Sequence, residues 1–111
     1  MELPFVSIVV IGLNEAANLE NTFRAILNMD YPSNKIEVIY VDTGSRDRSV
    51  QIARKYTSKV FIERSTWPTS GLARNRGIVE ASYDIIHFID GDISISEDYL
   101  QYAINMILNG K

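Results

Sequence analysis

The sequence of 111 residues contains no cysteine and a single histidine. Without cysteine, neither a disulfide scaffold nor a thiolate zinc site can form, and a reducing compartment is the default. The longest apolar run, from Phe5 to Leu13, is interrupted by Ser7 and Gly12 and is far shorter than the about 20 residues of a membrane span. Glu2 stands where a signal peptide would carry a basic residue. We therefore expect a cytoplasmic location, which leaves open a peripheral place at a membrane or within a larger membrane-attached protein.

The sequence also lacks a concentration of positive charge. Its net charge is −3, and its lysines and arginines are scattered along the chain. Nucleic-acid binding usually needs a basic stripe that displaces counterions from phosphates, so we expect no nucleic-acid partner. Hydrophobic residues make up 46% and charged residues 23%, which is typical of one compact domain, here residues 1–111.

Short β-branched runs alternate with segments of helical periodicity. The runs that predict strands are 6–11, 36–41, 59–62 and 85–89, and the segments that predict helices are 17–28, one capped by Asp47, 71–81 and one from about 94 to 109. This β-α-β-α-β-α-β-α order predicts an α/β fold of three layers, α/β/α and Rossmann-like, with a mainly parallel four-stranded sheet. Ligands of such sheets bind at the carboxyl ends of the strands.

Polar residues follow three of the predicted strands, in segments 14–15, 42–45 and 90–92. Carboxylates brought together at one sheet edge repel each other, and a hard divalent cation with oxygen ligands relieves that repulsion. Asp90-Gly91-Asp92 is the sharpest signal, because two carboxylates one residue apart can turn toward one ion. An ordinary Asp-Gly turn remains an alternative.

The other candidates each have a structural alternative. Asp42 could accept a hydrogen bond from a base or a ribose, or could only shape its loop as an Asx turn. Arg74 and Asn75 could hold a diphosphate through a planar guanidinium and an amide, or could be solvated surface residues. His87 lies in the middle of a predicted strand, which favours a core histidine over a catalytic base.

Taken in order, these segments resemble the family 2 glycosyltransferases of the GT-A fold. The resemblance rests on five motifs at normal spacing between Val6 and about Leu100. They are Val6-Ser7-Ile8-Val9-Val10, Asn14-Glu15, Val41-Asp42-Thr43-Gly44-Ser45-Arg46-Asp47, Ala73-Arg74-Asn75-Arg76-Gly77 and Phe88-Ile89-Asp90-Gly91-Asp92.

The resemblance implies a role for each matching position. Asp90 and Asp92 match the Asp-x-Asp signature that holds Mn²⁺ or Mg²⁺ with the diphosphate of a UDP- or GDP-sugar. The implied contacts with the nucleotide sugar are Asn14, Glu15, Asp42, Thr43, Arg74, Asn75 and Asp90. The implied reaction is glycosyl transfer to a hydroxyl of a glycan, lipid or protein acceptor.

The sequence departs from the family pattern at two places. Ile11-Gly12-Leu13 replaces a common Pro-Thr-Tyr, and Thr43 stands where many members have a second acid, so the identity of the nucleotide is open. The family's catalytic base lies in the second half of the domain, so we expect none within these residues. A non-catalytic nucleotide-sugar-binding fragment therefore remains an alternative. A sugar-phosphate nucleotidyltransferase would carry a glycine-rich basic loop after the first strand, which this chain lacks.

The resemblance also predicts self-association. A complete GT-A domain extends its sheet beyond the fourth strand, so we expect an uncovered sheet edge that favours a homo-oligomer. The apolar residues expected on that surface are Ile104, Met106, Ile107 and Leu108.

Overall fold

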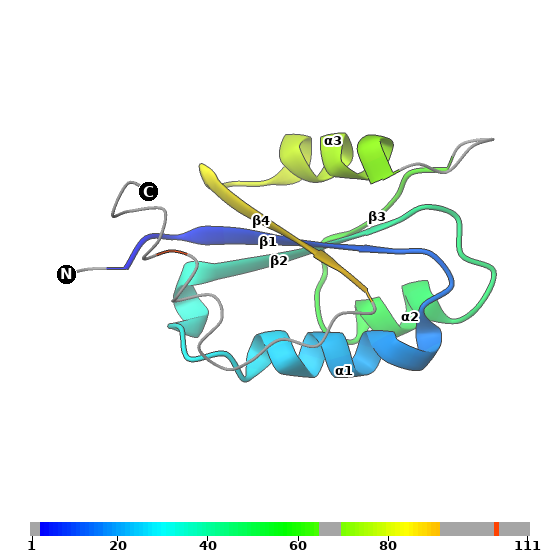
Figure 1. The fold of residues 1–111 in the computed structure, drawn as a ribbon, viewed down its shortest axis with the longest axis horizontal. Coiled ribbons are helices and arrows are strands. Elements are labelled where there is room, and N and C mark those ends of the chain that lie inside the picture. Colours follow the sequence, from blue (N-terminus) through cyan, green and yellow to red (C-terminus); the bar gives the residue numbers. More distant parts are fainter. Residues whose placement is uncertain (1–2, 65–69, 92–103, 105–111) are drawn as a thin grey trace.

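The computed structural model describes residues 3–64, 70–91 and 104, which form three α/β/α layers (Figure 1). The four strands are β1 (Val6–Gly12), β2 (Ile36–Asp42), β3 (Val60–Ile62) and β4 (Ile85–Asp90). All three neighbouring pairs are parallel, in the order β3-β2-β1-β4. The predicted parallel sheet is confirmed. The chain moves outward from β1 through β2 to β3 and returns to the other side at β4, so the switch in strand order lies between β1 and β4.

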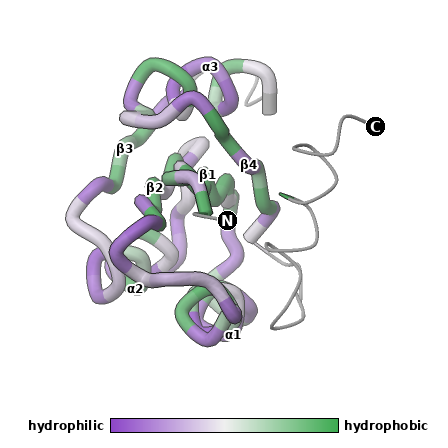
Figure 2. Tube along the Cα trace, turned by 90° about the vertical axis from the view of Figure 1, so that its left-hand side faces the viewer, coloured by the Kyte–Doolittle hydropathy of each residue, from purple (hydrophilic) through white to green (hydrophobic). Residues whose placement is uncertain are grey.

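Helices cover both faces of this sheet. Helices α1 (Ala16–Leu27) and α2 (Ser49–Arg54) lie on one face, and α3 (Ser70–Glu80) lies on the other, as the view in Figure 2 shows. A short 3₁₀ helix, η1 (Ser33–Lys35), precedes β2. In the described part of the chain, no helix is long and apolar enough to cross a membrane.

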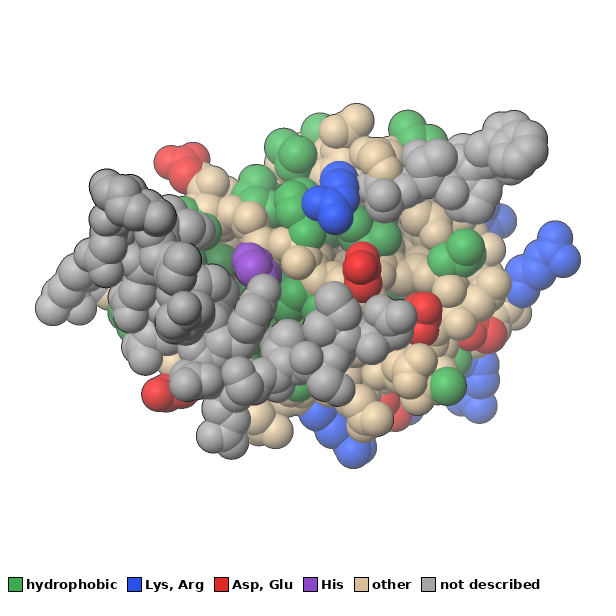
Figure 3. All heavy atoms as spheres, in the orientation of Figure 1, with side chains coloured by type: hydrophobic (Ala, Val, Ile, Leu, Met, Phe, Trp, Pro, Cys, Tyr) green, Lys and Arg blue, Asp and Glu red, His purple; other side chains and the backbone are tan. Residues whose placement is uncertain are grey.

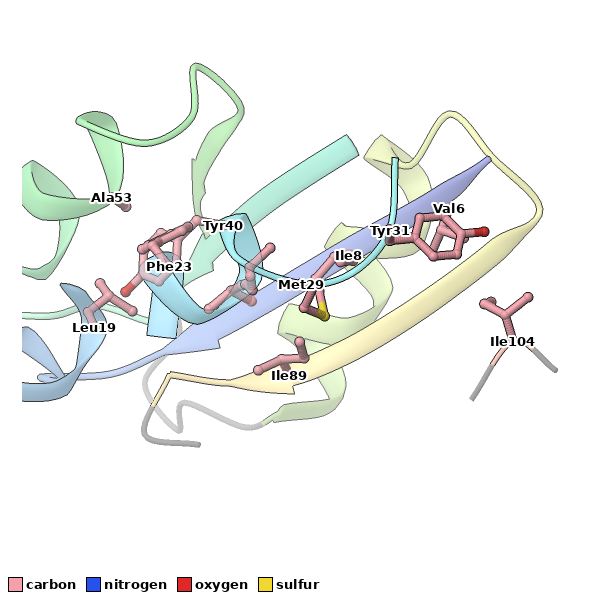
Figure 4. Close-up of a cluster of buried hydrophobic side chains, with 12 residues drawn as sticks. Val6, Ile8, Leu19, Phe23, Met29, Tyr31, Tyr40, Ala53, Ile89 and Ile104 are labelled. Carbon is pink, nitrogen blue, oxygen red and sulfur yellow. The ribbon is translucent and has the colours of Figure 1, made fainter. Parts of the chain in front are cut away.

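Each face of the sheet has its own apolar cluster, because successive side chains of a strand point to opposite faces. On the α1 face the cluster includes Val6, Ile8, Val10, Phe23 and Tyr40 (Figure 4). On the α3 face the cluster consists of Val9, Ile11, Ile39, Val41 and Ala73. Strand β1 is buried along its whole length, as its short β-branched run predicts.

Some element boundaries differ from the sequence prediction. Strands β2 and β4 each extend one residue further, to Asp42 and Asp90, because these residues still pair with Gly12 and Ile11 of β1. Asp47 does not hold the N-cap position of α2, which begins two residues later after Arg48. The Asp47 carboxylate instead accepts a hydrogen bond from the Ser49 N–H.

The predicted last helix lies outside the described residues except for Ile104, which is helical. The prediction that Ile104 belongs to an uncovered surface is wrong. Its side chain is 1% exposed and joins the apolar cluster on the α1 face. Met106, Ile107 and Leu108 lie outside the described residues, and the homo-oligomer stays a prediction.

Candidate functional site

The carboxyl ends of the strands bring the predicted segments together at one edge of the sheet. Gly12 pairs with Asp42, and Ile11 pairs with Asp90. Beyond the last pair, the Gly91 N–H donates to the Ile11 carbonyl at 2.8 Å. The predicted convergence of the three polar segments is therefore present for all of their described residues. Asp92 lies outside the described residues.

Asp42 is completely buried at this edge, with 0% of the residue exposed. Its Oδ1 accepts hydrogen bonds from the Tyr40 hydroxyl and the Ser45 hydroxyl, both at 2.6 Å. Its Oδ2 accepts from the N–H groups of Gly44 (2.9 Å) and Ser45 (2.6 Å). Four donors match the roughly four lone-pair sites of a carboxylate. The geometry favours the loop-shaping role that sequence analysis kept as the alternative for Asp42.

The loop after β2 also binds the loop after β1. Side chains of the β2–α2 loop and of α2 accept hydrogen bonds from consecutive backbone N–H groups at the start of α1. The pairs are Asn14 N–H with Ser45 Oγ (2.8 Å), Glu15 N–H with Ser49 Oγ (2.9 Å) and Ala16 N–H with Asp47 Oδ2 (3.1 Å). In return, Asn14 Oδ1 accepts from the Arg46 N–H at 2.8 Å. These three N–H groups are therefore not open to an anion, unlike the free helix N-terminus that binds phosphate in dinucleotide-binding folds.

Asp47 is the charged member of this contact between loops. Burial by itself raises the pKa of its carboxyl, but hydrogen bonds from the Ser49 hydroxyl and from the N–H groups of Ala16 and Ser49 together lower it below its usual value. The carboxylate form therefore binds the beginnings of α1 and α2 together. Asn14 itself adopts a φ of 54°, in the left-handed region that asparagine tolerates better than most residues.

Thr43 and Glu15, two of the predicted contacts, have different surroundings. Thr43 is 8% exposed, and both its N–H (3.1 Å) and its hydroxyl (3.4 Å) donate to the Gly12 carbonyl. Glu15 is half-buried, and its Oε1 accepts from the Asn18 amide at 3.2 Å. The Glu15 side chain lies beside Gly91, so it belongs to the neighbourhood of the Asp90-Gly91-Asp92 motif.

Gly91, the middle residue of the Asp90-Gly91-Asp92 motif, is packed directly against α1. A Cβ at Gly91 would lie 3.2 Å from Leu19 Cδ1 and 3.4 Å from Glu15 Cβ, so the backbone approaches the helix closely. The buried Thr22 hydroxyl donates to the Gly91 carbonyl at 2.8 Å. Asp90 is exposed, and no residue in the described part of the chain pairs with its carboxylate. The strand end is thus fixed while its carboxylate faces solvent.

The two arginines of α3 differ in their contacts. Arg76 forms ion pairs with Glu63 (3.2 Å) and Glu80 (3.0 Å), which raise the pKa of its guanidinium, and it lies over the Phe61 ring. Arg74 is exposed and lies over the Phe88 ring, 4.9 Å from its centroid, without an ion pair to any described residue.

Strand alternation puts Phe88 and Asp90 on the same face of β4, the face that α3 covers. The structure therefore places Arg74 on the side of the sheet toward which Asp90 points. Asn75, next to Arg74, is exposed. The face of the molecule shown in the space-filling view carries a basic side chain with acidic side chains below it (Figure 3).

His87 is half-buried in the middle of β4, where burial lowers the pKa of its imidazole. Part of its ring is visible in Figure 3 as the purple side chain. The predicted position in the middle of a strand is confirmed, but the residue is only half-buried and does not belong to the core.

The sequence did not reveal the residues that support the site segments through hydrogen bonds. Tyr40, Ser45, Ser49 and Thr22 were not assigned a role, although each hydrogen-bonds a predicted site segment. For Thr22 there was a signal, since it stands among the buried apolar positions of α1. A buried hydroxyl requires a partner, and the carboxyl edge of the sheet supplies it.

Within the described residues, no three His, Cys, Asp or Glu side chains cluster as a complete protein-made metal site would require. The arrangement instead fits a cation shared with a ligand. Asp90 supplies a carboxylate that no described residue pairs with, and Mg²⁺ or Mn²⁺ is commonly bound by one or two carboxylates together with substrate phosphates.

The comparisons with known proteins agree with this geometry. Residues 7–111 match the family model of glycosyl transferase family 2. The chain is similar to the glycosyltransferase AglE of Haloferax volcanii, with 36% identity over 110 residues that cover 95% of this chain and 36% of AglE.

Two solved structures are also similar. One is glucosyl-3-phosphoglycerate synthase from Mycobacterium tuberculosis in complex with Mn²⁺, UDP and glucosyl-3-phosphoglycerate (TM-score 0.79, 27% identity, 97% of this chain and 41% of that chain). The other is the mannosyltransferase PcManGT from Pyrobaculum calidifontis in complex with GDP-Man and Mn²⁺ (TM-score 0.72, 26% identity, 84% of this chain and 29% of that chain). The chain thus spans well under half the length of each.

Proposed function

The chain belongs to glycosyl transferase family 2, and we propose that it forms the part of such an enzyme that binds a nucleotide-diphosphate sugar with a divalent cation. The observation that carries the proposal is the exposed Asp90 carboxylate, which has no partner in the described part of the chain and stands at the switch between β1 and β4. The similar synthase and mannosyltransferase, which were solved with UDP or GDP-Man and Mn²⁺, support it.

In this proposal Asp90 and Asp92 hold Mn²⁺ or Mg²⁺ against the diphosphate. The bound cation would offset the negative charge that develops on the departing nucleoside diphosphate. Arg74 and Asn75 contact the diphosphate and the sugar, because the Arg74 guanidinium is exposed and its planar fork suits phosphate oxygens.

The nucleoside is proposed to lie against the loops after β1 and β2, along Asn14, Glu15 and Thr43. A direct contact of Asp42 with the base or ribose would require one of its four donors to leave. We therefore assign to Asp42 mainly the shape of this loop, with the nucleoside bound to the surface that it holds in place.

For the whole protein we propose glycosyl transfer from the nucleotide sugar to a hydroxyl of a glycan, lipid or protein acceptor. No described residue is proposed as the base that deprotonates this hydroxyl. A donor-binding role without turnover would give the same binding results for this chain, and measuring turnover of the nucleotide sugar separates the two.

Calorimetric titration with UDP, GDP and their sugars tests the proposal, each in Mn²⁺, in Mg²⁺ and in EDTA. Asp90→Asn and Asp92→Asn should each weaken metal-dependent binding at least about tenfold, which is the loss typical even of residues that only support metal ligands. Asp84→Asn is the matched control, because Asp84 is an exposed aspartate that immediately precedes β4, at its opposite end. Equal affinity in EDTA and in Mn²⁺ would contradict the metal role.

A further inference from the structure

Tyr40 is a buried tyrosine in β2 that the proposed chemistry does not use. The residue is 0% exposed, and its ring lies in the apolar cluster on the α1 face, 6.1 Å from the Phe23 ring at an angle of 54°. A tyrosine in such a place normally needs a partner for its hydroxyl. Here the hydroxyl donates to Asp42 Oδ1 at 2.6 Å, at the carboxyl end of the same strand.

The space for this hydroxyl is made by Gly12 on the neighbouring strand. A Cβ at position 12 would lie 2.5 Å from the Tyr40 hydroxyl oxygen and 3.0 Å from Tyr40 Cε1, closer than real side chains approach. Gly12 does not have a positive φ, so backbone conformation does not require glycine there. The steric requirement comes from Tyr40, and the two residues form a matched pair across β1 and β2.

From Tyr40 the hydrogen bonds continue outward into both loops. Asp42, held by Tyr40, also binds the hydroxyl and the N–H of Ser45. The Ser45 oxygen accepts from the Asn14 N–H, and Asn14 Oδ1 accepts from the Arg46 N–H. One buried hydroxyl is therefore connected, through a carboxylate and a serine, to the exposed loop proposed to contact the nucleoside.

We infer that Tyr40 is a positioning residue for the nucleotide: its hydroxyl, seated against Gly12, orients Asp42 and through it the loops that follow β1 and β2. This inference rests on the proposed function for its ligand. The part of the inference that says Tyr40 orders the two loops rests on the geometry alone. Tyr40 does not touch the nucleotide and acts only through Asp42.

The first test is Tyr40→Phe, which keeps the ring and removes only the hydroxyl. Tyr56→Phe is a matched control, because the Tyr56 ring stacks on the same Phe23 at 5.1 Å while its hydroxyl donates to Glu20, away from the loops. Amide hydrogen exchange of Gly44 and Ser45 should be about tenfold faster in Tyr40→Phe, as expected from the loss of a hydrogen bond to a carboxylate. Tyr56→Phe should leave the exchange of these two amides unchanged.

The second readout is calorimetry with UDP, GDP and pyrophosphate in Mn²⁺. Tyr40→Phe should weaken binding of the preferred nucleotide about three- to tenfold and leave pyrophosphate binding unchanged, because the disturbed loops contact only the nucleoside. Gly12→Ala, which pushes the Tyr40 ring away, should act in the same direction. The double variant should lose less binding free energy than the sum of the losses of the two single variants, because both changes break the same hydrogen bond.

The outcomes separate this inference from the proposed function. If neither UDP nor GDP binds the parent chain, the proposed function fails, and the exchange rates alone decide whether Tyr40 orders the loops. Unchanged exchange in a folded Tyr40→Phe overturns the inference. Faster exchange with unchanged nucleotide affinity also overturns it, because the order in the loops would then not serve the ligand.

Discussion

Acid should destabilise this chain through Glu37, a carboxylate near the start of β2, at the end of the sheet opposite the candidate site. Glu37 is 8% exposed, and its oxygens accept hydrogen bonds from the Ser7 hydroxyl (2.7 Å), from the Ser82 N–H and hydroxyl (2.8 Å each) and from Lys59. Burial by itself raises the pKa of Glu37, but the hydrogen bonds from Lys59, Ser7 and Ser82 together outweigh it and lower the pKa to about 2.

The size of the effect follows from linkage between protonation and folding. The pKa of Glu37 is 4.5 as an isolated group and about 2 in the folded chain. Each pKa unit corresponds to about 1.4 kcal/mol, so the ionised carboxylate contributes about 3 kcal/mol to the free energy of unfolding. Because the folded-state pKa is the lower one, this contribution is complete above about pH 4.5. It is lost as the pH falls toward 2.

The variant Glu37→Gln should remove most of this pH dependence and lower stability at pH 7 by about 3 kcal/mol. The amide in Glu37→Gln has only one oxygen, so it cannot accept hydrogen bonds from all four of the donors that bind Glu37. Lys59 would also lose the buried carboxylate with which its ammonium pairs. Chemical denaturation followed by circular dichroism at pH values from 7 to 2.5 measures both effects. Glu80→Gln is the control, because its ion pair with Arg76 is partly exposed and should matter little. If parent and Glu37→Gln lose stability in parallel below pH 4.5, the reasoning is refuted.

Two further substitutions test how the site is supported. Thr22→Val removes the hydroxyl that donates to the Gly91 carbonyl and should raise the Mn²⁺ concentration needed for half-maximal UDP binding about tenfold. Thr22→Ser keeps a hydroxyl and should need the same Mn²⁺ concentration as the parent chain. Equal Mn²⁺ requirements in the parent chain and both variants would refute this prediction. Gly77→Ala should destabilise the chain by about 1–2 kcal/mol in thermal denaturation, because its Cβ would lie 2.6 Å from Val9 Cγ1 in a close-packed face. Gly71→Ala, at an exposed position of the same helix, should not destabilise it.

The fold could be predicted because its periodicity is unambiguous. The short β-branched run of β1 predicts a strand buried on both faces, and β1 is buried along its whole length. The ends of the strands were predicted less accurately, because pairing with a neighbouring strand rather than local propensity decides where a strand ends. Asp42 and Asp90, read from the sequence as residues after their strands, are the last members of the ladders with β1.

The site could be predicted only in part, for a related reason. The sequence identifies which polar residues follow the strands, and sheet topology then brings them to one edge. It does not show how many donors a given carboxylate already has. Asp42 and Asp90 look alike as post-strand aspartates, yet one accepts four hydrogen bonds and is fully buried while the other is exposed. That difference depends on Tyr40 and Ser45, whose side chains meet Asp42 only in the folded chain.

The two aspartates mark two parts of the candidate site. In one part, which we call committed, the polar groups already bind each other, and in the other part, which we call open, the charged side chains have no described partner. In the committed part, around Asp42 and Asn14, side chains bind backbone N–H groups, so folding itself supplies the order of the loops. In the open part, Asp90 and Arg74 have no polar partner in the described part of the chain. A loop that is already ordered in the free protein costs no binding free energy when the ligand binds. Charged side chains without a partner gain the most electrostatic attraction from a ligand of opposite charge. The proposed ligand, a nucleoside diphosphate with a cation, would match both parts. Its base and ribose would bind the fixed surface, and its diphosphate and metal would supply the missing charges.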